Sequence, residues 1–377
     1  MVYLDYSATT PVDKEVLDSY IYVTNEYIGN VNSLHKLGLE SRKLYEDSIL
    51  EICRCLNCIP SEVIITSGAS ESNSLAILGT ALKEQAKDKK HIITSKLEHR
   101  SILDLLDYLK QSGVSVDYVK ILPNGQVDLL DLERLVDDNT ILVSICAVNS
   151  ETGYKQDLKA INEIIKKKNK NTLFHSDLTQ ALGKTKFDLK DVDLASFSSH
   201  KIYAPKGCGI LYKKRNVEID KLVYGVNSLY RYRGGTPALP LIVSFAVAIK
   251  KATENLEINI EKTRGLNQLL KDELSKYEVK INSNNFCIPQ IFNFSIMKMK
   301  GRDFVQEISK YGIYVSSTSA CSGSLNYSPV LAEVTNGNSE ISTTSVRVSL
   351  SHLTTNDDIK EFIKCFDIIY NKIQEYK

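Results

Sequence analysis

The sequence predicts an α/β fold, in which a large domain with a mostly parallel sheet flanked by helices is joined to a smaller α/β C-terminal domain. From about residue 62, short apolar runs rich in β-branched residues alternate with amphipathic stretches, which is the pattern of strands joined by helices in a parallel sheet. The run 140–148 (TILVSICAV) is almost continuously apolar, as expected of a strand buried on both faces. Near Pro237 the pattern changes to long helical stretches, which indicates a different unit.

The large domain is expected to span residues 13–255. Its first strand is EVIITS (62–67), and a helix follows from Glu71. The remaining strands are predicted at 91–95, 114–120, 140–148, 172–176, 194–198 and 207–212. Helical patterns at 101–111 and 158–168 fall between them, as βαβ connections require.

The smaller domain is expected at residues 256–377, with residues 1–12 joining it. One long helical stretch runs from Pro237 to about Tyr277. It is followed by a strand, a helix, a serine-rich loop, a second strand and a terminal helix, at 290–295, 303–311, 316–329, 345–350 and 356–376.

Composition excludes several classes of protein. Formal net charge is +1 over 377 residues, and the basic residues are mixed with acids, so no basic stripe for direct nucleic-acid binding is present. The N-terminus lacks the pattern of a secretory signal, and the longest apolar run, 238–249, is too short to span a bilayer. We therefore expect a cytoplasmic protein with no membrane partner.

Eight cysteines in such a chain are expected to be free thiols. Cys53, Cys55 and Cys58 form a C-x-C-x-x-C cluster that could bind a metal or an iron–sulfur centre. The pattern predicts a helix over 41–57, which places Cys55 and Cys58 on one face and Cys53 on another. Since no second cluster completes a ligand set, packing is the favoured interpretation and no metal is expected.

Lys201 is the first candidate for chemistry, in SFSSHKIYAPKG (196–207). It follows a strand directly, where an α/β sheet presents groups to a ligand, although a surface lysine fits this segment equally well. A lysine forms an imine only when its amine is partly deprotonated, which burial and neighbouring cations favour. Asp177 follows another strand and could pair with a pyridinium nitrogen, or it could cap a helix.

Two further segments point to a site. In TSGASESN (66–73), a strand ends and a helix begins at Gly68, Ala69 and Ser70, where free N–H groups and the helix dipole attract an anion such as phosphate. A capping box at the same serine is compatible with that role. Cys321 lies in the serine-rich loop, which is expected to be exposed and mobile. An exposed cysteine there is a nucleophile, a redox group or an accident of sequence.

Together these segments resemble the NifS/IscS-type cysteine desulfurases, which belong to the class V branch of the fold-type I pyridoxal-phosphate enzymes. The matching motifs occur in order over nearly the whole chain, and this order makes the resemblance specific. They include YLDYSATTPVD, GNVNSLHKLG, VIITSGASESNSLAI, HIITSKLEHRSIL, ILVSICAVNSETG, FHSDLTQALGK, FSSHKIYAPKG, RGGTPA, SSTSACSGSL and TTSVRVSLSHLTT. The long loop around Cys321 resembles the NifS/IscS group rather than the SufS-like group.

The resemblance implies a role for each matching residue. Lys201 corresponds to the Schiff-base lysine, Asp177 to the partner of the pyridinium nitrogen and His99 to the histidine that stacks on the cofactor ring and is a candidate acid or base. Other positions match groups that hold the cofactor phosphate or ring, namely Ala69, Ser70, Asn149, Gln180, Ser198 and His200. Gln180 is the one that hydrogen-bonds the ring's phenolic oxygen. Arg347, with Asn149, matches the group that holds the substrate carboxylate, for which a planar guanidinium is suited.

The resemblance also implies an activity and partners. Cys321, as a thiolate, attacks the sulfur of L-cysteine, which leaves a persulfide on the enzyme and releases L-alanine. Thr236 matches a residue that reaches the phosphate of a neighbouring subunit, which implies a homodimer with shared sites. The sulfur then passes to an acceptor protein, for iron–sulfur cluster assembly or for thiolation of tRNA or a cofactor.

Some positions depart from the family pattern without removing a catalytic group. The segment 223–236 (VYGVNSLYRYRGGT) lacks the usual glycine-rich stretch, which could alter the shared dimer site. Ser199 and Thr318 replace usual glycines, Val31 replaces a proline, and the tail after Arg347 is shorter than in IscS-type members. Two alternatives stay open: another class V enzyme (an aminotransferase, an epimerase or a β-lyase), which would not need Cys321, and a non-catalytic binding paralogue.

Overall fold

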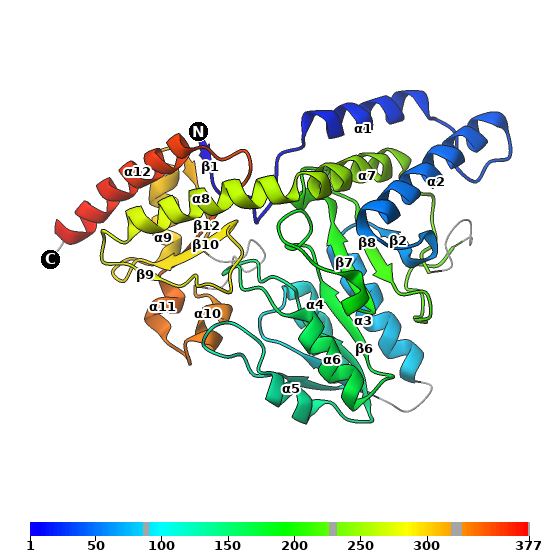
Figure 1. Cartoon of the computed structure of the whole chain (residues 1–377), viewed down its shortest axis with the longest axis horizontal. Helices are drawn as coiled ribbons and strands as arrows, with labels where there is room; N and C mark the ends of the chain where they lie inside the picture. Colours follow the sequence, from blue (N-terminus) through cyan, green and yellow to red (C-terminus); the bar gives the residue numbers. More distant parts are fainter. Residues whose placement is uncertain (86–89, 226–231, 318–325, 376–377) are drawn as a thin grey trace.

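The computed structural model describes residues 1–85, 90–225, 232–317 and 326–375. Two packed units are visible, and a nearly continuous pair of helices runs from one to the other (Figure 1). These helices are α7 (Leu239–Glu254) and α8 (Leu256–Leu274). The single long helix predicted from Pro237 to Tyr277 is therefore wrong in detail, because the helical hydrogen-bond pattern is interrupted at Asn255.

A seven-stranded sheet forms the centre of the larger unit, in the order β2-β8-β7-β6-β5-β3-β4. Only β8 runs antiparallel to its neighbours, so the sheet is mostly parallel. The strands are β2 (Val63–Thr66), β3 (His91–Thr94), β4 (Ser115–Tyr118), β5 (Thr140–Ser144), β6 (Leu173–Asp177), β7 (Leu194–Ser198) and β8 (Gly209–Lys213). The central strands β5, β7 and β8 are buried along their full length, as the apolar run in β5 predicts.

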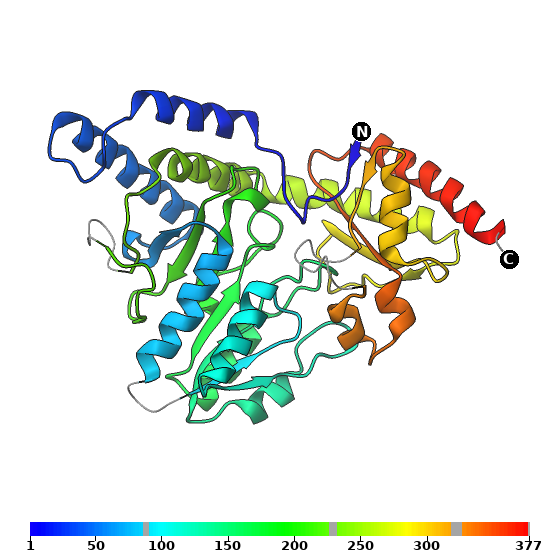
Figure 2. The ribbon, with the colours of Figure 1, turned by 180° about the vertical axis from the view of Figure 1, so that it is seen from behind.

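Helices cover both faces of this sheet. Apolar side chains of α3 (Ala69–Gln85) and α4 (Arg100–Gln111) pack on one face, the face seen in Figure 2. The opposite face is covered mainly by α2 (Lys36–Leu56), α5 (Leu129–Leu135), α6 (Leu158–Lys168) and α7. Helix α1 (Lys14–Glu26) lies outside α7 (Figure 1).

The smaller unit has its own apolar cluster, which includes Val2 and Leu4 from the N-terminus. Its three-stranded antiparallel sheet contains β9 (Lys280–Ile281), β10 (Ile291–Ser295) and β12 (Ser345–Ser349). The pair β1 (Val2–Tyr3) and β11 (Ile313–Tyr314) joins the N-terminal chain to this unit. The helices are α8, α9 (Gly301–Ser309), α10 (Pro329–Val334), α11 (Ser339–Thr343) and α12 (Asn356–Glu375). The predicted fold class is confirmed, and we keep the division at residues 12/13 and 255/256 as a proposal.

The first cysteine cluster differs from its prediction. Helix α2 ends at Leu56, and Asn57 adopts a left-handed conformation with φ 55°. The chain therefore reverses, the Cys58 N–H donates to the Cys53 carbonyl at 3.0 Å, and the neighbouring Cys53 thiol raises the pKa of the Cys58 thiol. Cys53 and Cys58 are thus the neighbouring pair, not Cys55 and Cys58. Across the described ranges, no three His, Cys, Asp or Glu side chains gather as a metal-ligand set.

Candidate functional site

Ten of the residues predicted for the site line a single cavity of about 390 Å³. They come from six separate stretches of sequence that meet at the carboxyl edge of the parallel strands, where α/β sheets bind ligands. These residues are Ala69, Ser70, His99, Asn149, Asp177, Gln180, Ser198, His200, Lys201 and Arg347. Thr236 is exposed and does not line this cavity, and Cys321 lies outside the described residues.

The turn from β2 into α3 is where the sequence predicts an anion site. Gly68 has φ 157° and lies so close to the start of β8 that a Cβ on Gly209 would come within 2.5 Å of its Cα. The Ser67 N–H donates to Glu71, and Glu71 in turn pairs with Arg233 at 3.0 Å, which fixes the loop before Thr236 beside this turn. The first N–H groups of α3 have no partner inside the helix, so they point at any anion bound there.

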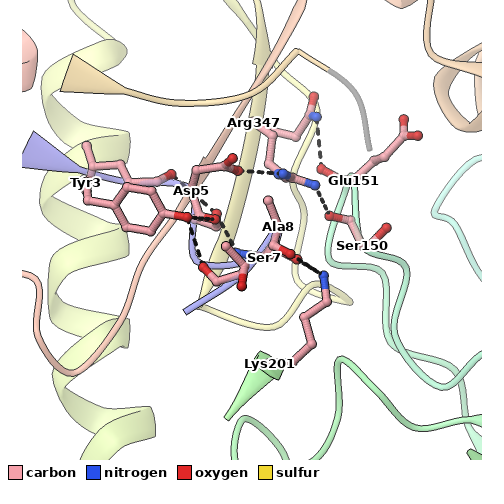
Figure 3. Close-up of polar contacts among 12 residues, drawn as sticks. Tyr3, Asp5, Ser7, Ala8, Ser150, Glu151, Lys201 and Arg347 are labelled. Atoms are coloured by element: carbon pink, nitrogen blue, oxygen red, sulfur yellow. Dashed lines mark hydrogen bonds and ion pairs between the residues drawn. The ribbon is translucent and has the colours of Figure 1, made fainter. Parts of the chain in front are cut away.

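Lys201 follows β7 in a single 3₁₀ turn (Ser199–Lys201). Its Nζ donates to the main-chain carbonyls of Ser7 and Ala8, at 2.5 and 2.8 Å (Figure 3). The N-terminal chain therefore passes directly over this amine. The neighbouring His200 is held by Thr9, at 3.1 Å from Nδ1, and burial together with Lys201 and Lys206 lowers the pKa of His200 to about 4. His200 is therefore neutral at physiological pH.

A hydrogen-bond network connects Asp177 with His99 through Asn73 and Ser101. The Asn73 amide donates to Asp177 Oδ2 and to Ser101 Oγ, both at 3.0 Å. The Ser101 N–H donates to His99 Nδ1 at 3.1 Å. Nδ1 is thus the acceptor nitrogen, and burial lowers the pKa of His99, so its neutral form carries the proton on Nε2.

Arg347 is 1% exposed and comes from the middle of β12. One terminal nitrogen pairs with Asp5 at 2.6 Å and the other donates to the Ser150 carbonyl at 2.9 Å (Figure 3). Its Nε has no hydrogen-bond partner in the part of the chain that the structure describes. This donor, with the remaining N–H bonds, is available to a carboxylate.

Asn149 caps the loop after β5. Its Oδ1 accepts from the backbone of Glu151 and Thr152, and its Nδ2 donates to the Leu97 carbonyl, all at 2.9 Å. One amide hydrogen is left for a ligand.

The site also contains residues that the sequence did not single out. Asp5, Ser7 and Ala8 lie in a matching N-terminal motif, and Asn73 and Ser101 lie in two others, but no local pattern assigns them a role. Their partners are distant in sequence: Asp5 and Arg347 are separated by 342 residues and Asn73 and Asp177 by 104. Only the family motifs around them carried any signal.

The residues present fit pyridoxal phosphate. The start of α3 has free N–H groups suited to a phosphate, Asp177 is a carboxylate buried to 8% exposure, and an imidazole and a primary amine line the same cavity. The unpartnered Nε of Arg347 adds a buried donor for an amino acid's carboxylate.

Comparison with known proteins is consistent across the chain. Residues 2–362 match the family described as class V aminotransferases. The cysteine desulfurase IscS of Photorhabdus laumondii subsp. laumondii is 38% identical over 384 residues, which cover 99% of this chain and 94% of that protein. A solved NifS-like protein superposes with a TM-score of 0.93 at 34% identity, covering 100% of both chains. A structure described as SspA in complex with cysteine has a TM-score of 0.81 at 30% identity and covers 93% of this chain and 99% of that one.

Proposed function

The chain belongs to the class V aminotransferase family and is a pyridoxal-phosphate-dependent cysteine desulfurase, and we propose that it transfers sulfur from L-cysteine to Cys321. The observation that carries this proposal is the position of Arg347. Its main chain pairs with Ser316, the last but one described residue before the segment that contains Cys321. Cys321 is five residues beyond Ser316, a reach of at most about 18 Å. The segment that carries the proposed nucleophile, Cys321, therefore starts beside Arg347, the proposed anchor of the substrate carboxylate.

The cofactor would be held by groups already described. Lys201 would bind it covalently, the α3 N-terminus with Ser70, Ser198 and His200 would hold its phosphate, and Asp177 would face its ring nitrogen. When bound, pyridoxal phosphate supplies an electron sink for the carbon skeleton of the substrate.

Side chains of the protein carry out proton transfer and orient the substrate. The Lys201 amine takes the Cα proton of the substrate, and the neutral His99 offers an Nε2–H as a general acid. Arg347 and Asn149 orient the substrate carboxylate. Burial and fixed partners pre-organise these groups, because Arg347 and Asn149 are at most 3% exposed.

The sulfur step balances without a further reagent. The Cys321 thiolate forms a bond to the sulfur of L-cysteine while the substrate's Cβ–S bond breaks. The electron pair of that bond stays with the carbon skeleton, which takes up a proton and leaves as L-alanine. Enzyme thiol and L-cysteine therefore become enzyme persulfide and L-alanine, and an acceptor protein then removes the sulfur by thiol exchange.

We also propose that the active form is a homodimer in the cytoplasm. Large apolar side chains are exposed on α1 and on the connection to α2, including Ile21, Tyr22, Ile28 and Leu34. So many exposed apolar side chains on neighbouring segments favour a second copy of the chain, and Thr236 would then reach the partner's phosphate. No helix within the described ranges is long and apolar enough to cross a membrane. The cytoplasm keeps thiols such as Cys321 reduced.

The decisive experiment incubates the purified protein with L-cysteine and measures L-alanine and the mass of the Cys321 peptide. Wild type should form alanine and gain one sulfur on Cys321. Cys321→Ser should lose sulfur transfer and keep the cofactor's visible absorbance, while Cys55→Ser, the matched control in α2, should behave as wild type. A fully active Cys321→Ser would support another class V reaction, and a protein that takes up no pyridoxal phosphate would support a binding paralogue.

The dimer has its own test. Light scattering should give the mass of two chains for wild type and of one chain for the double variant Ile21→Glu, Leu34→Glu. Ile258→Glu alters an equally exposed apolar residue on α8 and should leave the mass unchanged. A wild-type monomer with full activity would contradict the shared site.

A further inference from the structure

Lys184 is a buried lysine that the reaction described above does not use. It ends the turn after β6, only 9% exposed, and lines a second cavity of about 320 Å³ on the other side of Lys201. Gly183 allows this turn, since its φ is 70° and a Cβ there would come within 2.9 Å of Ala252. The backbone carbonyl of Lys184 also accepts from Gln290 at 3.0 Å. The fold therefore holds this lysine in place from both sides.

The amine of Lys184 has one neutral partner. Its Nζ donates to Gln180 Oε1 at 2.5 Å, and within the described ranges no carboxylate pairs with it. Burial lowers the pKa of the Lys184 amine well below its ordinary value, and Lys201 and Arg347 lower it further. A buried lysine without a counter-ion is costly, so a positional task is a better explanation than stability.

Gln180 links Lys184 to Lys201. Its Nε2 donates to the Ser7 carbonyl at 2.9 Å, and the same carbonyl accepts from Lys201 Nζ at 2.5 Å. Gln180 lines the 390 Å³ cavity and is 5% exposed. One amide hydrogen of Gln180 is left for a ligand in that cavity.

We propose that Lys184 is a positioning residue, which fixes the amide of Gln180 with its oxygen turned away from the cavity and its nitrogen available to it. A lysine suits this task because its amine donates an N–H to the Gln180 oxygen at 2.5 Å, whereas the two ends of a glutamine amide are nearly the same in shape and do not select an orientation by themselves. Gln180 therefore presents an N–H donor to the oxygen on the ring of bound pyridoxal phosphate. This inference rests on the proposed function, since it takes Gln180 to be a ligand of the cofactor.

The test measures the affinity of the apo-protein for pyridoxal phosphate, the absorbance maximum of the bound cofactor and the melting temperature of the apo-protein. Lys184→Met should raise the dissociation constant about fivefold or more, the factor that one hydrogen bond of ordinary net strength contributes. It should also shift the absorbance maximum, and Lys184→Arg should restore both because it keeps the donor. The matched control is Lys251→Met, which alters another lysine of the same second cavity that pairs with Asp13 and Glu15 at 2.8 Å.

A second variant makes the test independent of the folding of Lys184→Met. Gln180→Glu keeps an acceptor for Lys184 but has no N–H for the cavity, so it should lose at least as much cofactor affinity as Lys184→Met. A Lys184→Met protein with wild-type affinity and absorbance would overturn the proposal, as would a change no larger than that of Lys251→Met. If the wild-type protein binds no pyridoxal phosphate, the proposed function itself is wrong. If the wild-type protein binds it and only the Lys184 result is negative, this inference alone is wrong.

Discussion

Removing the carboxylate of Asp5 should expose how strongly the N-terminal chain supports Arg347. The guanidinium is 1% exposed, and the Asp5 side chain, 18% exposed, lies 2.6 Å from it. Removing one partner of a buried ion pair costs about 3–5 kcal/mol. Because Asp5 is partly exposed and the Ser150 carbonyl remains, we expect the lower end, about 3 kcal/mol for Asp5→Ala. At roughly 2 °C per kcal/mol for a large chain, the melting temperature should fall by about 6 °C.

The assay combines thermal melting of the apo-protein with steady-state kinetics. Asp5→Asn keeps an acceptor oxygen and should lose about half as much stability as Asp5→Ala. Both variants should raise KM for L-cysteine, because Arg347 is no longer held in one orientation. Glu261→Gln, which removes an exposed ion pair with Arg264, is the control and should cost at most about 1 kcal/mol. If Asp5→Ala melts like Glu261→Gln with an unchanged KM, the ion pair does not support Arg347.

Three further changes test the buried polar groups. Asn73→Ala removes both links between Asp177 and Ser101, so the rate of alanine formation should fall about tenfold or more, and an unchanged rate would show that the network is dispensable. Burial raises the pKa of Glu98 to about 8 from 4.5, so the folded state keeps its proton longer than the unfolded state. Stability should therefore fall by up to about 1.4 kcal/mol per pH unit between those values as pH rises, and melting curves of Glu98→Gln should lack this slope. His175 lies between Ser144 and Ser196, and burial lowers its pKa to about 4 from 6.5. The unfolded state therefore takes up the proton first, so the stability that neutral His175 provides is present above pH 6.5 and is lost as pH falls toward 4. His175→Gln should flatten that acid limb, and parallel curves for variant and wild type would contradict the assignment.

The larger sheet could be predicted from local pattern because its central strands are buried on both faces. Such a strand needs apolar residues at consecutive positions, which gives long apolar runs such as 140–148. The same holds for the turn into α3, where a strand end, a glycine and a serine indicate a helix start. The break at Asn255 and the reversal at Asn57 could not be read in this way. Both depend on one residue's backbone conformation, and tertiary packing selects that conformation.

The sequence by itself determined the α/β fold class and the order of the motifs that name Lys201, Asp177, Arg347 and Cys321. The family motifs also assigned most of the cavity, and strand ends alone placed Lys201 and Asp177 together, because the carboxyl ends of parallel strands meet at one edge. Only the tertiary structure decided which groups hold them. No periodic pattern in the sequence predicts these contacts, which are the Asp5–Arg347 ion pair, the hydrogen bonds from Lys201 to Ser7 and Ala8, and the hydrogen bond from Lys184 to Gln180. Each depends on the close approach of chain segments, and on burial that makes an unpaired polar atom costly.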